Sequence, residues 1–491
     1  MLLDQLIDQL KIYKTNSDLK GIEISSIEMD SREVSVGSLF VCLQGMTVDG
    51  HEFVDNAIED GAAAILSEKP LDCSVPVIVV PSTIKSLAIL ADYFYGMPSQ
   101  HMNVVGITGT NGKTTMTYLI DEIFRKYGHK TAIVGTIHMK IGDHQYPVRN
   151  TTPDSLFLHK HFHQMLEAGV HTVIMEVSSH ALSMGRVYGI DFNSAIFTNL
   201  TQDHLDYHLN MNDYAYAKSL LFSQLGNEFQ PKRKTAVINV DDPYADVMSR
   251  ATSQEVVTYG LGKEAFIRAD NIRLDSNQSK FDLILGEEIV PIEARLPGKF
   301  NVYNMLGAIA LAYSYNIPVE TVKKALEETN GVPGRFEAVN IGQPFTVIVD
   351  YAHTPDSLEN VLQSIVELKK KRVYTVVGCG GDRDRTKRPK MADVAMKYSN
   401  FVYFTSDNPR NEDPKQILKD MTGHITGHDF HVIIERERAI QQAIQTASEG
   451  DIVLIAGKGH ETYQEVKGER VHFDDREVAK EAIERFLKEQ S

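Results

Sequence analysis

The sequence predicts an α/β protein with three domains, each built around a mostly parallel sheet. The first reason is length, because 491 residues are too many for one ordinary domain. The second is pattern, because short apolar runs of strand length alternate with helix-like stretches, as in βαβ units. The third is a Pro/Gly-rich break at 331–337. We therefore expect domains at 1–98, 99–331 and 332–491.

The composition is that of a globular chain, with 42% hydrophobic and 24% charged residues. The formal net charge of −16 argues against broad nucleic-acid binding, which needs a basic face. Anionic substrates would have to be met by local positive clusters. The three cysteines, Cys42, Cys73 and Cys379, are far apart and form no CxxC pair, as expected in a reducing cytoplasm.

The N-terminal stretch 1–14 is amphipathic and contains two aspartates, so it lacks the apolar centre of a signal peptide. The sequence has no apolar run of the roughly eighteen residues that a membrane span needs. We expect a cytoplasmic protein that does not insert into membranes, and we expect it to be a monomer.

The first domain is predicted to be a small α/β unit. Apolar runs of strand length lie at 37–45, 62–68 and 75–81, with helix-like segments between them. A further helix-like segment, 86–98, leads into the second domain.

The central domain opens with a strand at 104–108, a glycine-rich loop, and a helix whose apolar residues recur at helical spacing up to Gly128. Four further runs read as buried strands: 131–137, 173–177, 194–200 and 234–240. This order predicts a P-loop-type domain with a parallel sheet, which binds ligands at the carboxyl ends of its strands.

The third domain is predicted to be Rossmann-like and doubly wound. Each of its strand candidates ends in a polar or glycine-rich turn, and they lie at 346–352, 373–381, 401–407 and 452–459.

The loop GITGTNGKTT, 106–115, has the features of a phosphate-binding loop. Its glycines relieve crowding so that backbone N–H groups can face a phosphate at the start of a helix. Lys113 can reach terminal phosphates, and the hydroxyl of Thr114 or Thr115 can reach magnesium. The loop departs from the standard formula, because Ile107 stands where the first glycine is expected. We therefore expect nucleotide binding with a variant loop geometry.

Five motifs together resemble the Mur ligase family of ATP-dependent peptide-bond-forming enzymes, and the similarity covers essentially the whole chain. They are TGTNGKTT (108–115), MEVSSHAL (175–182), TNLTQDHLDYH (198–208), GKFNVYN (298–304) and GVPGRFE (331–337). The resemblance implies an N-terminal domain for a UDP-sugar, a central ATPase domain and a C-terminal domain for the incoming amino acid.

The reaction that the resemblance implies starts from UDP-MurNAc-L-Ala-D-Glu. ATP phosphorylates the side-chain carboxylate of D-glutamate, and the amino group of the next amino acid attacks the acyl phosphate. This order is chemically sensible, because phosphate leaves readily whereas hydroxide does not. Catalysis of the first step is positioning and charge neutralisation, with Mg²⁺ bridging the negative groups.

The resemblance assigns residues to ATP and to the metal ion. The ATP-binding residues are Thr108, Gly109, Thr110, Asn111, Gly112, Lys113, Thr114, Asn301, Arg335, Asp350 and His353. The catalytic residues are Lys113, Glu176, His204 and Lys218, and magnesium is held by Thr114, Glu176, His204 and Lys218 as a carbamate, N6-carboxylysine.

Simpler alternatives stay open for several of these residues. Glu176 and His204 follow strands and could be ordinary hydrogen-bonding residues. Lys218 lies in an amphipathic helical pattern, where a lysine usually faces solvent. Asn301 and Asn304 could cap the start of a helix.

The muramoyl dipeptide is expected to meet hydroxyls, amides and one guanidinium, which suit sugar, peptide and anionic groups. The residues that the resemblance assigns are Ser31, Asn150, Thr151, Thr152, Ser178 and Arg186. The stretch NTTPDS, 150–155, could also be a helix N-cap, and the two interpretations are compatible.

The amino acid is expected at two charge-dense segments, 379–390 and 406–414, which follow strands of the third domain. Alternatively, both are solvated faces. In the family, DNPR accompanies addition of meso-diaminopimelate, and Arg410 can pair with its second carboxylate but repels the ammonium of lysine. The residues assigned to the amino acid are Arg383, Asp407, Asn408, Pro409, Arg410, Gly457 and Glu461, the last suited to an ammonium.

Three other functions compete with this interpretation. Two of them are ligases: a lysine-adding synthetase of the same family and, more remotely, folylpolyglutamate synthetase. The motif DNPR and the N-terminal segment MDSREV…GMTVDGH count against folylpolyglutamate synthetase. A P-loop switch or motor belongs to a different class, since it would hydrolyse ATP without the muramyl acceptor.

Overall fold

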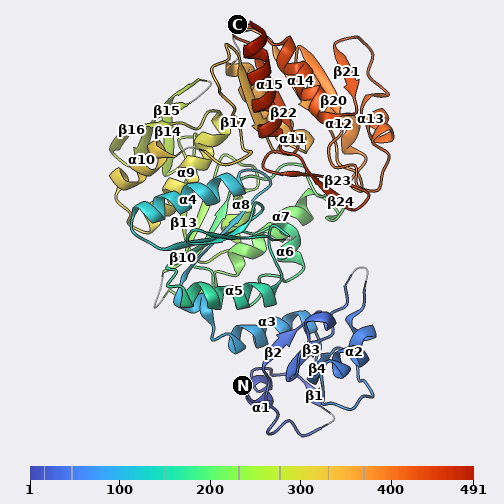
Figure 1. The fold of residues 1–491 in the computed structure, drawn as a ribbon. Coiled ribbons are helices and arrows are strands. Elements are labelled where there is room, and N and C mark those ends of the chain that lie inside the picture. The colour runs from blue at the N-terminus through green and yellow to red at the C-terminus, as the bar shows by residue number, and fades with distance from the viewer. Residues whose placement is uncertain are drawn as a thin grey trace.

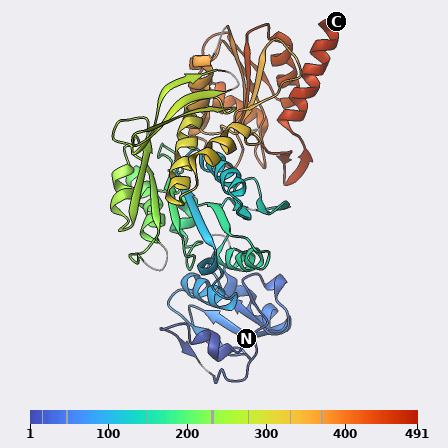
Figure 2. The same ribbon diagram turned by 90° about the vertical axis from the view of Figure 1, so that its left-hand side faces the viewer.

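The computed structural model describes residues 1–15, 17–45, 48–148, 150–229, 233–275, 278–329, 331–368 and 371–490. Three sheets follow one another along an elongated molecule, with the N-terminal sheet at one end and the C-terminal sheet at the other (Figure 1). Figure 2 shows the same order after a quarter turn. In the described part of the chain, no helix is both long and apolar enough to cross a membrane.

The N-terminal sheet has the strand order β1-β5-β4-β3-β2, in which only β1 is antiparallel to its neighbour. Its strands are β1 (Lys14–Thr15), β2 (Ser26–Glu28), β3 (Ser38–Val41), β4 (Ala62–Ser67) and β5 (Val77–Val79). The helices are α1 (Leu3–Ile7), α2 (Val54–Glu59) and α3 (Thr83–Phe94), with short 3₁₀ turns at Ser31–Glu33, Gly50–Phe53 and Pro98–His101. Strands β3, β4 and β5 lie inside the three predicted apolar runs.

The central sheet has the order β16-β15-β14-β13-β12-β11-β6-β10-β7-β8-β9. Its middle is parallel, as predicted, and consists of β6 (Asn103–Thr108), β7 (Thr131–Val134), β10 (Thr172–Glu176), β11 (Ser194–Phe197), β12 (Thr235–Asn239), β13 (Glu255–Gly260) and β14 (Ile267–Leu274). Antiparallel strands extend both edges, namely β8 (Met139–Ile141), β9 (His144–Tyr146), β15 (Ser279–Leu285) and β16 (Glu288–Ala294). The predicted parallel sheet is confirmed in the middle, and the antiparallel strands at its edges are an addition that the sequence interpretation did not include.

Helices cover both faces of the central sheet. One face carries α4 (Lys113–Lys126), α9 (Lys299–Ser314) and α10 (Val319–Glu328), whose apolar residues share a core with β13 to β16. The other face carries α5 (Ser155–Glu167), α6 (Ser179–Ser183), α7 (Met211–Ser223) and α8 (Ala245–Arg250). A hydrophobic core thus lies on each face of the sheet. The loop between β6 and α4 lies at the carboxyl edge of the sheet.

The C-terminal sheet has the order β17-β18-β22-β19-β20-β21, and all its strands except β17 are parallel. The strands are β17 (Glu337–Ala338), β18 (Thr346–Asp350), β19 (Val373–Val377), β20 (Phe401–Thr405), β21 (Phe430–Ile433) and β22 (Ile452–Ala456). One face packs against α11 (Pro355–Leu368), α12 (Lys387–Tyr398) and α13 (Pro414–Thr422), and the other against α14 (Arg436–Thr446) and α15 (Asp475–Gln490). A hairpin of β23 (Tyr463–Val466) and β24 (Glu469–His472) follows β22. The predicted doubly wound arrangement is confirmed.

Candidate active site

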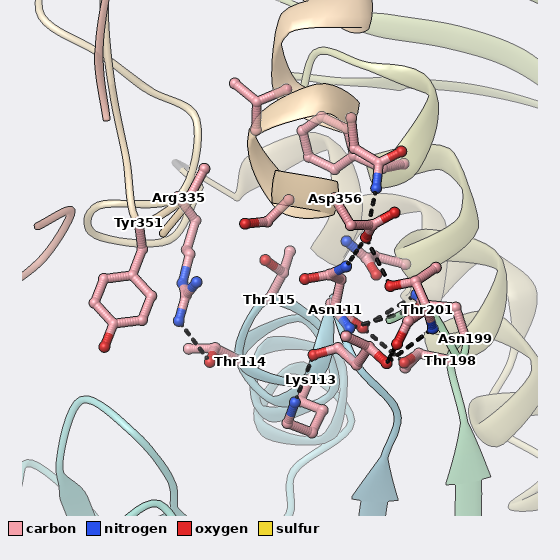
Figure 3. Close-up of a pocket in the computed structure, with 18 of the residues that line it drawn as sticks. Asn111, Lys113, Thr114, Thr115, Thr198, Asn199, Thr201, Arg335, Tyr351 and Asp356 are labelled. Atoms are coloured by element: carbon pink, nitrogen blue, oxygen red, sulfur yellow. Dashed lines mark hydrogen bonds between the residues drawn. The ribbon is translucent and has the colours of Figure 1, made fainter. Parts of the chain in front are cut away.

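A cavity of about 560 Å³ lies between the central and the C-terminal sheets. Its floor is the loop between β6 and α4, and its opposite wall comes from the start of α11 and from the turn that carries Arg335 (Figure 3). Predicted residues that line it are Thr110, Asn111, Gly112, Lys113, Thr114, Thr151, Glu176, Ser178, His204, Asn304, Arg335, Asp350 and His353. Residues from all along the predicted nucleotide motifs therefore meet in one space.

The glycine-rich loop needs glycine at two positions. Gly109 and Gly112 have φ angles of 148° and 86°, and an added Cβ would overlap the side chains of Thr198 and Asn304 respectively. Ile107, the residue that breaks the standard formula, lies inside β6 and is fully buried in the core. The position of the first glycine in the standard formula is therefore a core position of the strand in this chain.

Lys113 is the first residue of α4, and its side chain curls back onto the loop. Its Nζ donates to the carbonyl oxygens of Gly109 and Thr110 at 2.9 and 2.8 Å. Burial lowers the pKa of this lysine, although the carboxylate of Glu176 opposes the shift. The side-chain nitrogen of Lys113 thus lies next to the N-terminus of α4, where a phosphate binds best.

Glu176 is the last residue of β10 and is 1% exposed. Both of its carboxylate oxygens accept hydrogen bonds. It accepts hydrogen bonds from Thr114 Oγ1 at 3.0 Å and from the backbone and hydroxyl of Thr136 at 2.9 and 3.0 Å. Thr114 Oγ1 also accepts a bond from Arg335, at 3.1 Å. A buried carboxylate and a hydroxyl are thus paired at the start of the loop helix.

His204 lies in the loop after β11 and is 43% exposed. Its φ is 54°, a left-handed conformation that costs energy for a residue with a Cβ. The ring stands edge-on to His180 at 4.7 Å, and Nε2 lies 3.4 Å from Asp203. The surrounding structure must hold His204 in this conformation, in which it lines the cavity.

Lys218 does not face solvent, so the solvated-face alternative is wrong. It is 1% exposed on α7, where its Nζ donates to the carbonyl of Gly109 at 2.9 Å and lies 4.4 Å from the ring centre of Tyr214. Burial lowers its pKa well below the usual range, and the charge of Lys113 adds to the shift. Its surroundings therefore disfavour the charged form of this lysine beside the nucleotide loop.

Of the four predicted magnesium residues, the structure brings Thr114 and Glu176 into direct contact. His204 lines the same cavity, and Lys218 supports the loop from behind. Across the described residues there is no group of three or more His, Cys, Asp or Glu side chains arranged to hold a metal ion. Carboxylate and hydroxyl oxygens are nevertheless the ligand type that Mg²⁺ prefers, so the donor set at Glu176 and Thr114 fits that ion.

The C-terminal domain reaches the loop through Arg335 and Asp356. The guanidinium of Arg335 lies 4.4 Å from the ring centre of Tyr351 while it donates to Thr114. Asp356, on α11, accepts bonds from Asn111 and Thr201, both at 2.7 Å. Asp356, Thr201 and Tyr351 were missed at the sequence level, although Thr201 lies within the motif TNLTQDHLDYH and the other two lie within three positions of the predicted His353.

The other predicted nucleotide residues take different positions. Asp350 accepts the N–H groups of Phe336 and Ala352 at 2.7 Å each, so it braces the turn that carries Arg335. His353 lines the cavity, and its Nδ1 lies 2.9 Å from the carbonyl of Tyr351. Thr108 ends β6 and is buried.

The helix-cap alternative for the two asparagines is wrong. Helix α9 is capped by Gly298, without a side-chain cap, and both asparagines lie inside the helix. Asn301 is buried and donates to the carbonyl of Pro297 at 2.8 Å. Asn304 is the asparagine that lines the cavity.

The predicted dipeptide residues form a second hydrogen-bonded group next to Glu176. Thr152 Oγ1 donates to the carbonyl of Glu176 at 2.9 Å and accepts from the N–H of Ser178 at 3.0 Å. Arg186 donates to the carbonyl of Thr152 at 3.1 Å. The predicted N-cap is also confirmed, since Asp154 accepts from Phe157 at the start of α5.

Two predicted dipeptide residues lie apart from this group. Asn150 is exposed, and Ser31 opens a 3₁₀ turn of the N-terminal domain, where Asp30 provides the cap. Neither is among the residues that line the cavity.

The predicted amino-acid residues gather at the carboxyl edge of the C-terminal sheet. Asp407 and Asn408 follow β20 and are buried, and Asn408 Nδ2 donates to Glu461 at 2.8 Å. Gly457, with φ 119°, follows β22, and a Cβ there would lie 2.7 Å from the carboxylate of Asp407. The solvated-face alternative is therefore wrong for 406–409, the first part of the segment after β20, whereas Asn411 and Asp413 are exposed.

The two arginines of this group differ. Arg410, with φ 50°, donates from Nη1 to the carbonyl of Gly381 at 2.7 Å. Arg383 is exposed and donates to the carbonyl of its neighbour Asp382 at 3.3 Å, so the solvated-face description fits it in this structure. Lys458, which the sequence interpretation missed, is fully buried and lies between Asn408 and Glu461. Its position directly after Gly457 was the available signal.

Three family profiles match the chain. They are described as the Mur ligase family catalytic domain, over 23–95, the Mur ligase middle domain, over 107–312, and the Mur ligase glutamate ligase domain, over 334–459.

The chain is also similar to curated proteins from Bacillus cereus and Listeria innocua. The first is 55% identical over 462 residues, which cover 94% of each chain. The second is 50% identical over 489 residues, which cover 99% of each. Both are named UDP-N-acetylmuramoyl-L-alanyl-D-glutamate–2,6-diaminopimelate ligase.

A solved structure of a protein with that same name matches with a TM-score of 0.72 and 33% identity over 98% of both chains. A MurF ligase from Thermotoga maritima in complex with ADP matches with a TM-score of 0.65 at 17% identity, over 96% of this chain and all of the other. The latter likeness concerns the fold alone.

Proposed function

Because this chain belongs to the Mur ligase family, we propose that it is an ATP-dependent ligase of the MurE type. It joins meso-diaminopimelate to the D-glutamate side chain of UDP-MurNAc-L-Ala-D-Glu in peptidoglycan precursor synthesis, and it works in the cytoplasm as a monomer. One observation supports the proposal above the others: Thr114 of the nucleotide loop bonds both Glu176 and, across the domain boundary, Arg335.

The three domains divide the substrates. Residues 1–98 bind the UDP-sugar end, 99–331 bind ATP, and 332–491 bind the amino acid. The cavity between the last two domains supports this division, because phosphoryl transfer and amide formation must occur at a point that both domains reach.

The nucleotide loop binds the phosphates of ATP through its backbone N–H groups and Lys113. On binding, Lys113 exchanges the carbonyls of Gly109 and Thr110 for phosphate oxygens. Arg335 adds a second cation from the opposite wall. Its planar guanidinium is suited to bind the negatively charged phosphoryl group during its transfer. Asn304 and the start of α9 lie on the side where the nucleoside would extend.

Mg²⁺ would be held by Glu176 and the hydroxyl of Thr114, with His204 and Lys218 completing its surroundings. When bound, it neutralises charge between the ATP phosphates and the acceptor carboxylate.

Lys218 carries a carbamate in this proposal. Its burial favours the neutral amine, the form that adds carbon dioxide with release of one proton. The product is an anion, and Lys113 would then be a favourable neighbour, not a repulsive one.

The dipeptide lies along Thr151, Thr152, Ser178 and Arg186, which brings the side-chain carboxylate of its D-glutamate beside Glu176 and the nucleotide loop. Ser31 and Asn150 contact the more distant sugar and nucleotide end. The amine that attacks the acyl phosphate comes from the amino acid held by Asp407, Asn408, Pro409, Arg410, Gly457 and Glu461, with Arg383 closing over it.

Release of phosphate tests the proposal. Purified protein with ATP and Mg²⁺ should release phosphate at a substantial rate only when the UDP-linked dipeptide and meso-diaminopimelate are both present, and mass spectrometry should detect the lengthened peptide. Faster turnover with L-lysine would identify the lysine-adding type. ATP hydrolysis at the same rate without the muramyl acceptor would instead identify a switch or motor, and the proposal would be abandoned.

A further inference from the structure

The amino-acid cluster contains a buried cation that none of the assignments above uses. Lys458 follows β22, is 0% exposed, and has its Nζ 3.1 Å from Glu461 Oε2 and 3.0 Å from Asn408 Oδ1. A lysine is rarely buried this completely unless its charge is paired. Here both of its partners belong to the group that is proposed to receive the amino acid.

Lys458 fixes the orientation of Asn408. The amide oxygen of Asn408 accepts from Lys458 Nζ and from the N–H of Glu465, both at 3.0 Å. Both of these groups can only donate, so the amide oxygen must face them and the NH₂ group must face Glu461. An uncharged side chain at position 458 would remove one of the two donors that enforce this orientation.

Lys458 also balances the charge of two carboxylates. Asp407 directly precedes Asn408, which donates to Glu461, and the charge of Asp407 adds to the larger effect of burial in raising the pKa of Glu461. Arg436 is a second buried cation, and the charges of Asp407 and Glu461 act on it as well, but its hydrogen bonds go to Asp475, at 2.7 Å in two bonds, and to the carbonyl of Ala456. Lys458 is therefore the cation in contact with Glu461.

The balance matters because the two candidate amino acids differ in charge at their far end. Meso-diaminopimelate ends in a carboxylate and an ammonium, which cancel, whereas lysine ends in an ammonium alone. Two carboxylates without a cation would attract the lysine ammonium, and a cation beside them opposes it.

We propose that Lys458 is a specificity-determining residue, which acts through Asn408 and Glu461 to make the site neutral enough for a zwitterionic amino-acid end and unfavourable for a lone ammonium. This inference rests on the proposed function, and it gives the choice of amino acid a second determinant besides Arg410.

The test is a double-mutant cycle with Lys458→Met and Glu461→Gln, assayed for kcat and KM with meso-diaminopimelate and with L-lysine. Lys458→Met should raise the ratio of kcat/KM for lysine to that for diaminopimelate by roughly tenfold or more, mainly through KM. Glu461→Gln alone should lower the ratio, because Lys458 is then unopposed. In the double variant the effect of removing Lys458 should shrink to less than about threefold, because the charges are removed together.

A purely structural lysine would give a different result. Both amino acids would then lose activity in parallel in Lys458→Met, the ratio would stay constant, and the inference would be overturned. If Lys458→Met does not fold, Glu461→Gln still decides, since an unchanged ratio there contradicts the charge argument. A wild-type protein that uses neither amino acid would refute the proposed function itself, which separates the two failures.

Discussion

The nucleotide cavity and the amino-acid cluster are built in different ways. The cavity is assembled from two domains, since Asn111 and Thr114 of the central domain bond Asp356 and Arg335 of the C-terminal domain. The amino-acid cluster lies at one sheet edge, and Asn408, Lys458 and Glu461 bond one another without help from another domain. Changes at the cavity should therefore slow the reaction with every amino acid, whereas changes at the cluster should alter which amino acid is used.

The largest effect is expected from Gly109→Ala. The new Cβ would overlap Thr198 at a φ that L side chains rarely adopt, so the loop must move away from the phosphate position. Activity should fall by about 10³-fold or more, because phosphoryl transfer depends on exact positioning of the phosphates and on the groups that stabilise their charge. Gly128→Ala is the matched control, because φ is 102° there but the space is open. The control should lose only about 1 kcal/mol of stability. An active Gly109→Ala enzyme would contradict the geometry of the loop.

Lys218→Ala should come next, with a loss of about 10²–10³-fold. If the residue acts as a carbamate, adding a short-chain carboxylic acid should restore part of the activity by supplying the missing anion in the vacated space. The same acid should not help Lys113→Ala, where a cation is missing. Full activity of Lys218→Ala without any addition would refute the carbamate.

Arg335→Ala should lower kcat by about 10²-fold with diaminopimelate and with lysine alike. The reason is that the guanidinium of Arg335 donates to Thr114 of the nucleotide loop and lies over the ring of Tyr351, which lines the cavity. Steady-state kinetics with both amino acids measure this. A change in the ratio between them would mean that the two regions are coupled more tightly than their contacts indicate.

Arg410→Ala should have a smaller and more selective effect. The value of kcat/KM for diaminopimelate should fall by about 10- to 100-fold, while that for lysine should stay constant or rise. Arg438→Ala, an exposed change on α14, serves as the control for loss of one arginine. Equal losses with both amino acids would show that Arg410 is needed for folding of the loop and not for recognition.

The smallest effect concerns Glu412, which joins the two loops beside the amino-acid cluster. Its carboxylate accepts bonds from buried Arg388 and from the N–H of Asp382, and Arg388 is the main cause that lowers the pKa of Glu412 to about 2. Because the folded pKa lies below the unfolded value of about 4.5, this stabilisation is complete above pH 4.5 and is lost as the pH falls toward 2. Glu412→Gln should therefore be less stable than the wild type at pH 7 in urea unfolding. The difference should shrink as the pH falls below 4.5, and a constant difference would exclude the ion pair as its cause.

Local pattern was sufficient to predict the strand, loop and helix around Gly109, because apolar periodicity and glycine spacing are both short-range signals. It was not sufficient for the antiparallel edges of the central sheet, where β15 and β16 alternate in burial and resemble surface segments. For Lys218, helical periodicity correctly predicted a helix but not the burial of the side chain. The reason is that Lys218 contacts the nucleotide loop, which lies more than a hundred positions earlier in the chain. Asp356 was missed because its partners, Asn111 and Thr201, lie more than 150 positions earlier in the chain.

The bonds of Asp356 to the nucleotide loop have a consequence for protein engineering. The C-terminal third that carries the selecting arginine also supplies one wall of the ATP chamber. A chimera made by exchanging that entire third with a lysine-adding relative would replace this wall as well, and would put phosphoryl transfer at risk. Transplanting only the short turns that follow β20 and β22 should alter the product while leaving the chamber intact.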